Sequence, residues 1–140
     1  MMHERDRKRC PWTVVISGAV NGIGHAKAEA FSRQGALLVV AHDADSLEDV
    51  ASRCRPFGTE ASPVSADAAK PEEAAPLAHC AVVFGGGIDV WVSNVGTGAV
   101  SAFKEVPLEM QEPAVRANLI GHMKDAHAAV PICLQDLGRE

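Results

Sequence analysis

The sequence has 140 residues, with 13 Lys plus Arg, 18 Asp plus Glu and a formal net charge of −5; 47% of its residues are hydrophobic. Length and apolar content fit one globular domain and exclude a chain that is disordered throughout. The acidic balance argues against general nucleic-acid binding, which needs a basic face, and the absence of Tyr excludes any mechanism that depends on a tyrosine acid.

The ends of the chain and its Cys and His residues give little indication of function. Residues 1–11 read as a flexible polar arm, with a basic contact patch as the alternative, and residues 12–140 as one domain. The longest clean apolar run, residues 36–41, is far shorter than the roughly 18 residues of a membrane span. The four Cys and six His lack metal-ligand spacing. We therefore expect a cytoplasmic protein with reduced thiols, no metal and no membrane partner.

Segments of strand and helix character alternate along the domain. Strands are predicted at residues 12–17, 37–41, 61–66 and 88–93, because each is a short run of apolar or β-branched residues. The helix after the first strand has apolar residues at helical spacing: Ile23, Ala26, Ala30 and Phe31. The second helix is predicted to be capped by Ser46, with three residues turned inward: Leu47, Val50 and Ala51.

Two further helices complete the alternation. One is predicted from Pro71 to about residue 84. The last helix is marked by an amphipathic series: Leu119, Met123, Ala126, Val130 and Leu134. Before it, Pro113 either interrupts a helix or begins one. The alternation predicts an α/β fold, a Rossmann-type doubly wound parallel sheet of order 3-2-1-4, with ligands at the carboxyl ends of strands 1 and 4.

A glycine-rich segment, V-V-I-S-G-A-V-N-G-I-G at residues 14–24, lies between the first strand and first helix. Glycines let the backbone approach a ligand, and free N–H groups at a helix start favour an anion such as a pyrophosphate. A plain tight turn is the alternative. Gly22 is not followed by Lys, which excludes a P-loop.

An acidic residue after the second strand suits the ribose of a dinucleotide. Asp43 is the candidate. The alternatives are that His42 fills this position, or that Asp43 is only a solvated residue of a turn. Neither Arg nor Lys stands at Asn21, His42 or Asp43 to pair with a 2′-phosphate. NAD is therefore favoured over NADP.

The spacing G-x-x-x-G-x-G resembles the glycine motif of the short-chain dehydrogenase/reductase family, with Ser17 in place of its usual Thr. S-N-V-G at residues 93–96 is similar to the family's N-N-A-G: Asn94 and Gly96 match, while Ser93 and Val95 depart. Asp67, followed by Ala68, looks like the family's adenine-contacting acid, and Asn118 resembles the Asn of its proton relay. The resemblance implies these cofactor-binding residues: Ser17, Gly18, Asn21, Gly22, Ile23, Gly24, Asp43, Asp67, Ala68, Asn94, Val95 and Gly96.

The resemblance implies an NAD(P)-dependent oxidoreductase that transfers hydride between a nicotinamide and an alcohol or carbonyl substrate. The family's catalytic Ser, Tyr and Lys follow a fifth strand, which would begin about where the sequence ends, at Glu140. We therefore expect the cofactor-binding half, a sheet truncated after its fourth strand and following helix, inactive alone. The alternatives are a non-catalytic nucleotide-binding module, held as a homo-oligomer through strand 4, or a truncated non-functional product.

Overall fold

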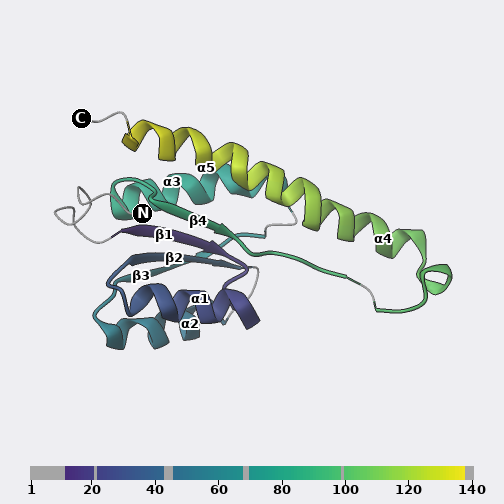
Figure 1. Cartoon of the computed structure of the whole chain (residues 1–140), viewed down its shortest axis with the longest axis horizontal. Coiled ribbons are helices and arrows are strands. Elements are labelled where there is room, and N and C mark those ends of the chain that lie inside the picture. Colours follow the sequence, from purple (N-terminus) through teal and green to yellow (C-terminus); the bar gives the residue numbers. More distant parts are fainter. Residues whose placement is uncertain (1–11, 21, 43–45, 68–69, 99, 138–140) are drawn as a thin grey trace, which may run out of the picture.

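The computed structural model describes residues 12–20, 22–42, 46–67, 70–98 and 100–137. Its strands are β1 (Thr13–Ser17), β2 (Leu37–His42), β3 (Ala61–Ser65) and β4 (Val90–Ser93). They form one parallel sheet in the order β3-β2-β1-β4 (Figure 1). The predicted order is confirmed, although β4 begins at Val90 rather than at Ile88.

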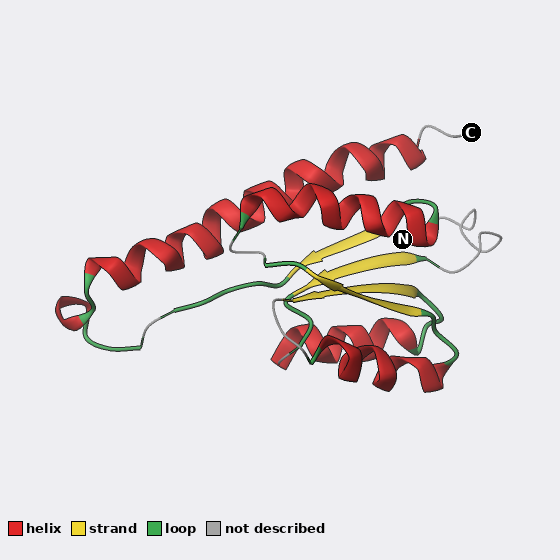
Figure 2. Ribbon diagram, turned by 180° about the vertical axis from the view of Figure 1, so that it is seen from behind, coloured by secondary structure: helices red, strands yellow, loops and turns green. Residues whose placement is uncertain are grey.

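Helices cover both faces of the sheet. They are α1 (Gly22–Ser32), α2 (Leu47–Cys54), α3 (Ala74–Gly85), α4 (Leu108–Val115) and α5 (His122–Leu137). Short 3-10 turns lie at Arg55–Phe57, Pro71–Glu73 and Phe103–Glu105, and a π-helical segment, Arg116–Gly121, joins α4 to α5. Figures 1 and 2 show α1 and α2 on one face and α3 and α5 on the other, while α4 extends beyond the carboxyl ends of the strands. Among the described residues, no helix is both long and apolar enough to cross a bilayer.

The core forms one layer on each side of the sheet because successive strand residues point to opposite faces. All five residues of β1 are buried. Val14 and Ile16 pack toward α1 and α2, whereas Val15 packs toward α3. Strands this apolar on both faces are typical of a sheet covered by helices on both sides.

Of the four apolar residues at helical spacing in α1, Phe31 packs against the core, but the others do not. Ile23 is 68% exposed, and Ala26 and Ala30 are exposed as well. The buried residues are instead Gly24, Ala28 and Ser32. The reason is the close contact of Gly24 with the loop after β1: a Cβ there would lie 2.1 Å from the carbonyl oxygen of Gly18.

The inward face of α2 is confirmed, since Leu47, Val50 and Ala51 are buried. The predicted cap is wrong in one respect. Ser46 precedes the helix, but its hydroxyl makes no capping hydrogen bond.

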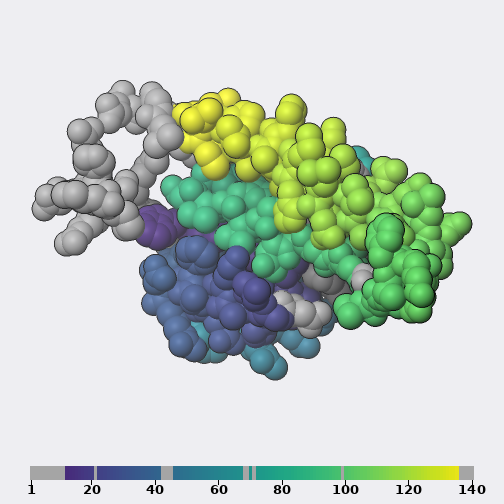
Figure 3. Space-filling view, turned by 45° about the vertical axis from the view of Figure 1, so that its right-hand side comes forward, coloured from purple at the N-terminus to yellow at the C-terminus, as the bar shows by residue number. Residues whose placement is uncertain are grey.

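Pro113 lies inside α4, which begins at Leu108, so a helix starting at Pro113 is ruled out. The amphipathic series of the last helix turns away from the sheet: Leu119, Met123, Val130 and Leu134 are each more than half exposed. In Figure 3 this yellow-green segment lies on the surface of the molecule. Small or polar residues are buried instead: Ala117 and Gly121 in the π-helical segment, and Asp125 and Ala129 in α5.

The amino end of β1 is fixed to the chain that precedes β4. The Thr13 backbone N–H donates to Asp89 Oδ2 (2.8 Å), and the Thr13 hydroxyl donates to the Gly85 carbonyl (3.2 Å). A Cβ on Gly85 would lie 2.0 Å from Thr13 Oγ1, so this contact requires glycine.

Candidate functional site

The loop between β1 and α1 adopts a conformation that favours glycine. Gly18 (φ +66°) and Gly22 (φ +54°) are in the left-handed region, which side chains with a Cβ disfavour. A Cβ on Gly18 would lie 2.8 Å from the carbonyl oxygen of Asn94, and one on Gly24 would meet Gly18. Three of the predicted glycines are thus needed for backbone geometry, and Ile23 stands exposed beside them.

The ends of β1 and β4 are joined at this loop. The Asn94 side-chain amide donates to the Gly18 carbonyl (3.3 Å), and the Asn94 backbone N–H donates to the Ser17 hydroxyl (3.3 Å). Val95 lies against Gly18, because its Cγ2 would be 3.2 Å from a Cβ there. The structure therefore brings together Ser17, Gly18, Gly24, Asn94 and Val95 at the point where the strand order reverses, which is where ligands bind in open α/β sheets.

Asn118 lies in the π-helical segment and holds the chain that follows β4. Its Oδ1 accepts the Thr97 backbone N–H (3.0 Å), and its Nδ2 donates to the Thr97 carbonyl (2.5 Å). A Cβ on Gly96 would lie 3.0 Å from the same Oδ1. Asn118 is exposed, so in this structure it orders the Gly96 loop.

A small pocket lies at the carboxyl ends of β1 and β3. Its lining residues are Ser17, Ala66, Asp67, Glu73, Ala74, Leu77 and Asp125. Asp67 is held in place locally, since its backbone N–H donates to Glu73 Oε2 (2.5 Å) and Lys70 Nζ lies 3.8 Å from its Oδ2. Three other predicted site residues, Asn21, Asp43 and Ala68, lie outside the described residues.

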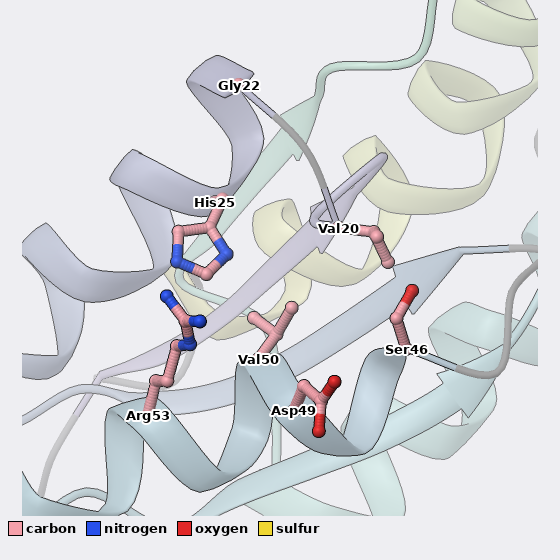
Figure 4. A pocket seen from close by; sticks show the side chains of 7 residues that line it. All are labelled: Val20, Gly22, His25, Ser46, Asp49, Val50 and Arg53. Atoms are coloured by element: carbon pink, nitrogen blue, oxygen red, sulfur yellow. The ribbon is translucent and has the colours of Figure 1, made fainter.

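A larger groove of about 370 Å³ lies between α1 and α2 next to the glycine loop (Figure 4). Its lining residues are Val20, Gly22, His25, Ser46, Asp49, Val50 and Arg53. In Figure 4 the side chains of His25 and Arg53 point toward one another. His25 also lies 3.3 Å from Glu29, and Asp49 contributes a carboxylate, so the groove carries charges of both signs.

Sequence reasoning missed a buried polar cluster below the glycine loop. Asp125 of α5 is 4% exposed, and its Oδ2 accepts hydrogen bonds from Ser93 (2.6 Å) and Ser17 (3.2 Å). His122 Nδ1 lies 2.5 Å from Ser93 Oγ. The only feature of the sequence that pointed to this cluster was Ser93, which departs from the first Asn of the family's N-N-A-G motif. Asp125 bonds to the serines, not to the imidazole, so a nucleophilic triad with an acid-oriented histidine is not formed.

The described residues around this site form no metal centre. Within the described part of the chain, no group of three or more His, Cys, Asp or Glu side chains is arranged to hold a metal ion. The clear pKa shifts lie elsewhere: a hydrogen bond from Arg55 lowers the pKa of the exposed Glu48, and burial raises the pKa of the Cys54 thiol.

Comparisons with known proteins agree with this geometry. A family model described as short chain dehydrogenase matches residues 12–139. An L-rhamnose 1-dehydrogenase (NAD(P)(+)) of Azotobacter vinelandii is 34% identical over 122 residues, and a 1-deoxy-11-beta-hydroxypentalenate dehydrogenase of Streptomyces exfoliatus is 37% identical over 124. These matches cover 84% and 86% of this chain, but 48% and 45% of the relatives.

A solved structure shows the same relation. The alcohol dehydrogenase of Thermococcus sibiricus, determined in complex with 5-hydroxy-NADP, superposes with a TM-score of 0.84 at 28% identity. The match covers 89% of this chain and 54% of that one. The chain thus spans about half the length of the relatives it matches.

Proposed function

This chain belongs to the short chain dehydrogenase family, and from that premise we propose that it is the dinucleotide-binding half of an oxidoreductase acting on an alcohol or carbonyl substrate. The bound dinucleotide would supply the hydride chemistry of the nicotinamide ring. The protein's own contribution is to bind and orient that cofactor. The observation that carries the proposal is the contact of Gly18, Gly24 and Asn94, which brings the loops after β1 and β4 together where the strand order reverses.

The predicted residues occupy several positions around the glycine loop. Gly18, Gly22, Ile23 and Gly24 form the loop that would receive the pyrophosphate at the start of α1. Asn94, Val95 and Gly96 border the same crevice from β4, and Asp67 would contact the adenine from β3. Ser17 acts beneath the loop by accepting the Asn94 N–H. Asn118 would support the proton relay of the whole enzyme through the Gly96 loop.

We propose NAD rather than NADP as the cofactor. Asp43 would accept hydrogen bonds from the adenosine ribose and repel a 2′-phosphate. Residues 1–140 contain no Tyr, so we expect cofactor binding without turnover from this chain alone; a non-catalytic nucleotide-binding module is the alternative that fits the same residues.

The test is equilibrium binding of NADH to residues 1–140 and to Gly24→Ala. NADH at 100 times its dissociation constant should raise the unfolding free energy by about 2.7 kcal/mol and the melting temperature by roughly 5–11 °C. Gly24→Ala should abolish this shift, because its Cβ would collide with the Gly18 carbonyl.

Gly98→Ala is the matched control, since a Cβ there meets nothing within 4 Å. It should bind like the wild type. A melting temperature of the wild type that does not respond to NADH would refute the proposal, and a larger response to NADPH would refute the preference for NAD.

A further inference from the structure

The buried carboxylate of Asp125 is the least expected polar group in the described structure. It lies on the inner face of α5, between the small residues Gly121 and Ala129. Among the described residues, no Lys, Arg or His nitrogen is recorded within 4 Å of it. Because a buried charge is costly unless paired or hydrogen-bonded, such a residue points to a requirement other than packing.

The partners of Asp125 come from the two strands that border the proposed cofactor crevice. Ser17 is the last residue of β1, and Ser93 is the last residue of β4. Both hydroxyls lie within hydrogen-bond distance of the same oxygen, Oδ2. One carboxylate on α5 therefore holds two strand ends that adjoin each other in the sheet.

The hydrogen bonds around Asp125 have a consistent direction. Ser93 donates its single proton to Asp125, so the Nδ1 of His122 must be the donor to Ser93 Oγ. On the other side, Ser17 accepts the Asn94 N–H while its own proton is directed to Asp125 or, at 3.3 Å, to the Val92 carbonyl. Both serine hydroxyls point toward α5, because the same Oδ2 accepts a hydrogen bond from each of them.

The cluster continues into the glycine loop. Asn94, whose N–H is bound by Ser17, donates its side-chain amide to the Gly18 carbonyl. The loops after β1 and β4 lie close together, since a Cβ on Gly18 would lie 2.8 Å from the Asn94 carbonyl oxygen. A shift of Ser17 or Ser93 would therefore change the width of the crevice.

We infer that Asp125 is a positioning residue for the dinucleotide site, which it sets through Ser17 and Ser93. The identity of the ligand in this inference rests on the proposed function, whereas the hydrogen bonds of Asp125 do not depend on it. Asp125 itself need not touch the cofactor. Its effect is to fix the relative position of the β1 and β4 loops before a ligand arrives.

The chain contains a matched control at the other end of the same strands. Asp89 also links β1 to the β4 region through a carboxylate, by accepting the Thr13 N–H at 2.8 Å. Asp125→Ala and Asp89→Ala each remove one such link, at the carboxyl and amino ends respectively. Two measurements compare them in the 140-residue chain: the dissociation constant for NADH, and amide hydrogen exchange at Asn94 and Thr13 relative to Val39 in the sheet centre.

Asp125→Ala removes the contacts to both Ser17 and Ser93, so it should weaken NADH binding about tenfold and should accelerate exchange at Asn94. Asp89→Ala should accelerate exchange at Thr13 and leave NADH binding unchanged. Asp125→Asn, which keeps one acceptor oxygen, should restore most of the affinity. Ser93→Ala removes the shorter bond without a large cavity, and it decides the question if Asp125→Ala does not fold.

The inference is overturned if Asp125→Ala and Ser93→Ala bind NADH as the wild type does, or if Asp89→Ala weakens binding equally. If the wild type binds no NADH, the proposed function fails separately. The exchange data then decide the positioning role alone: faster exchange at Asn94 but not at Thr13 supports it, and equal effects at both ends overturn it.

Discussion

The two helical layers of the molecule bury their apolar residues to very different extents. On the α1/α2 side, the apolar face of α2 lies against strand residues such as Leu38 and Val40, all of them buried. On the other side, α3 is packed similarly, but the segment from α4 to α5 exposes large apolar side chains: Leu108, Met110, Val115, Leu119, Met123, Val130 and Leu134. Figure 2 shows this segment running past the carboxyl ends of the strands.

The difference shows what apolar periodicity does and does not predict. In α2 the periodic residues face the sheet and belong to the same core cluster as Leu38 and Val40. In α5 the small residues and Asp125 face the sheet, and the larger periodic residues face outward. Periodicity therefore identifies a helix, whereas the size and polarity of the residues decide which side meets the sheet.

The largest expected effect comes from truncating a core residue on the α1/α2 side. Ile16 is fully buried at the centre of the sheet, so Ile16→Ala should lower the unfolding free energy by about 2–5 kcal/mol. Leu119→Ala, on the exposed segment, should change it by less than about 0.5 kcal/mol. Urea unfolding of both variants measures the contrast, and similar losses would show that the exposed segment is part of the cooperative core.

The next effect concerns α4, which runs directly into the π-helical segment. Pro113 lies inside this helix and costs about 3 kcal/mol relative to Ala, less the entropy it removes from the unfolded chain. Pro113→Ala should therefore stabilise α4 locally by about 2 kcal/mol, seen as slower amide exchange there. Pro107, just before the helix, is the control: Pro107→Ala should leave that exchange nearly unchanged.

A smaller, pH-dependent effect arises from Cys54 on the α1/α2 side. Burial raises the pKa of this thiol above its usual value of 9.0, so the unfolded state releases its proton first as the pH rises. The unfolding free energy should therefore be unaffected well below that value and fall as the pH rises through it. Cys54→Ala should remove this alkaline decline.

The burial of Cys54 has a check of its own. Iodoacetamide should modify the exposed Cys80 in the native protein but spare Cys54; early modification of Cys54 would contradict its burial.

The smallest effect on stability is expected for polar replacements on the exposed segment. The double variant Leu119→Gln, Leu134→Gln should shift the unfolding free energy by less than about 1 kcal/mol, the sum of two surface changes. It should nevertheless reduce binding of the apolar dye ANS to the native protein, because it removes exposed apolar area. Unchanged dye binding would mean that these side chains are already covered in solution.

The fold was predictable because each step of it is encoded locally. Short apolar strands, helical spacing and the right-handed crossover rule lead to the order β3-β2-β1-β4. The same holds for the centre of the site, since the glycine spacing places Gly18 and Gly24 at the end of β1, and Asn94 follows the adjacent strand.

The errors concern contacts between residues far apart in sequence. Ile23 belongs to the apolar series of α1 but is exposed, because Gly24 is the residue that approaches Gly18. Ser17 and Asp125 are 108 residues apart, and a lone Asp in an amphipathic helix carries no local sign of burial. Such pairings depend on tertiary packing, which periodicity does not describe.

The two edges of the sheet differ in their capacity to be extended. Leu38 pairs with Ala61 and donates its N–H to the Glu60 carbonyl. The backbone N–H and C=O groups of Ser62 and Val64 therefore point toward β2, whereas the backbone of Pro63 points to the open side of β3. That side lacks a donor at its midpoint, whereas β4 carries no proline. Growth of a fibre needs two receptive edges on each molecule, and a closed pair needs only one. Pro63 therefore makes the β3 edge the less receptive of the two, so strand pairing between copies through β4 favours a closed pair over a filament.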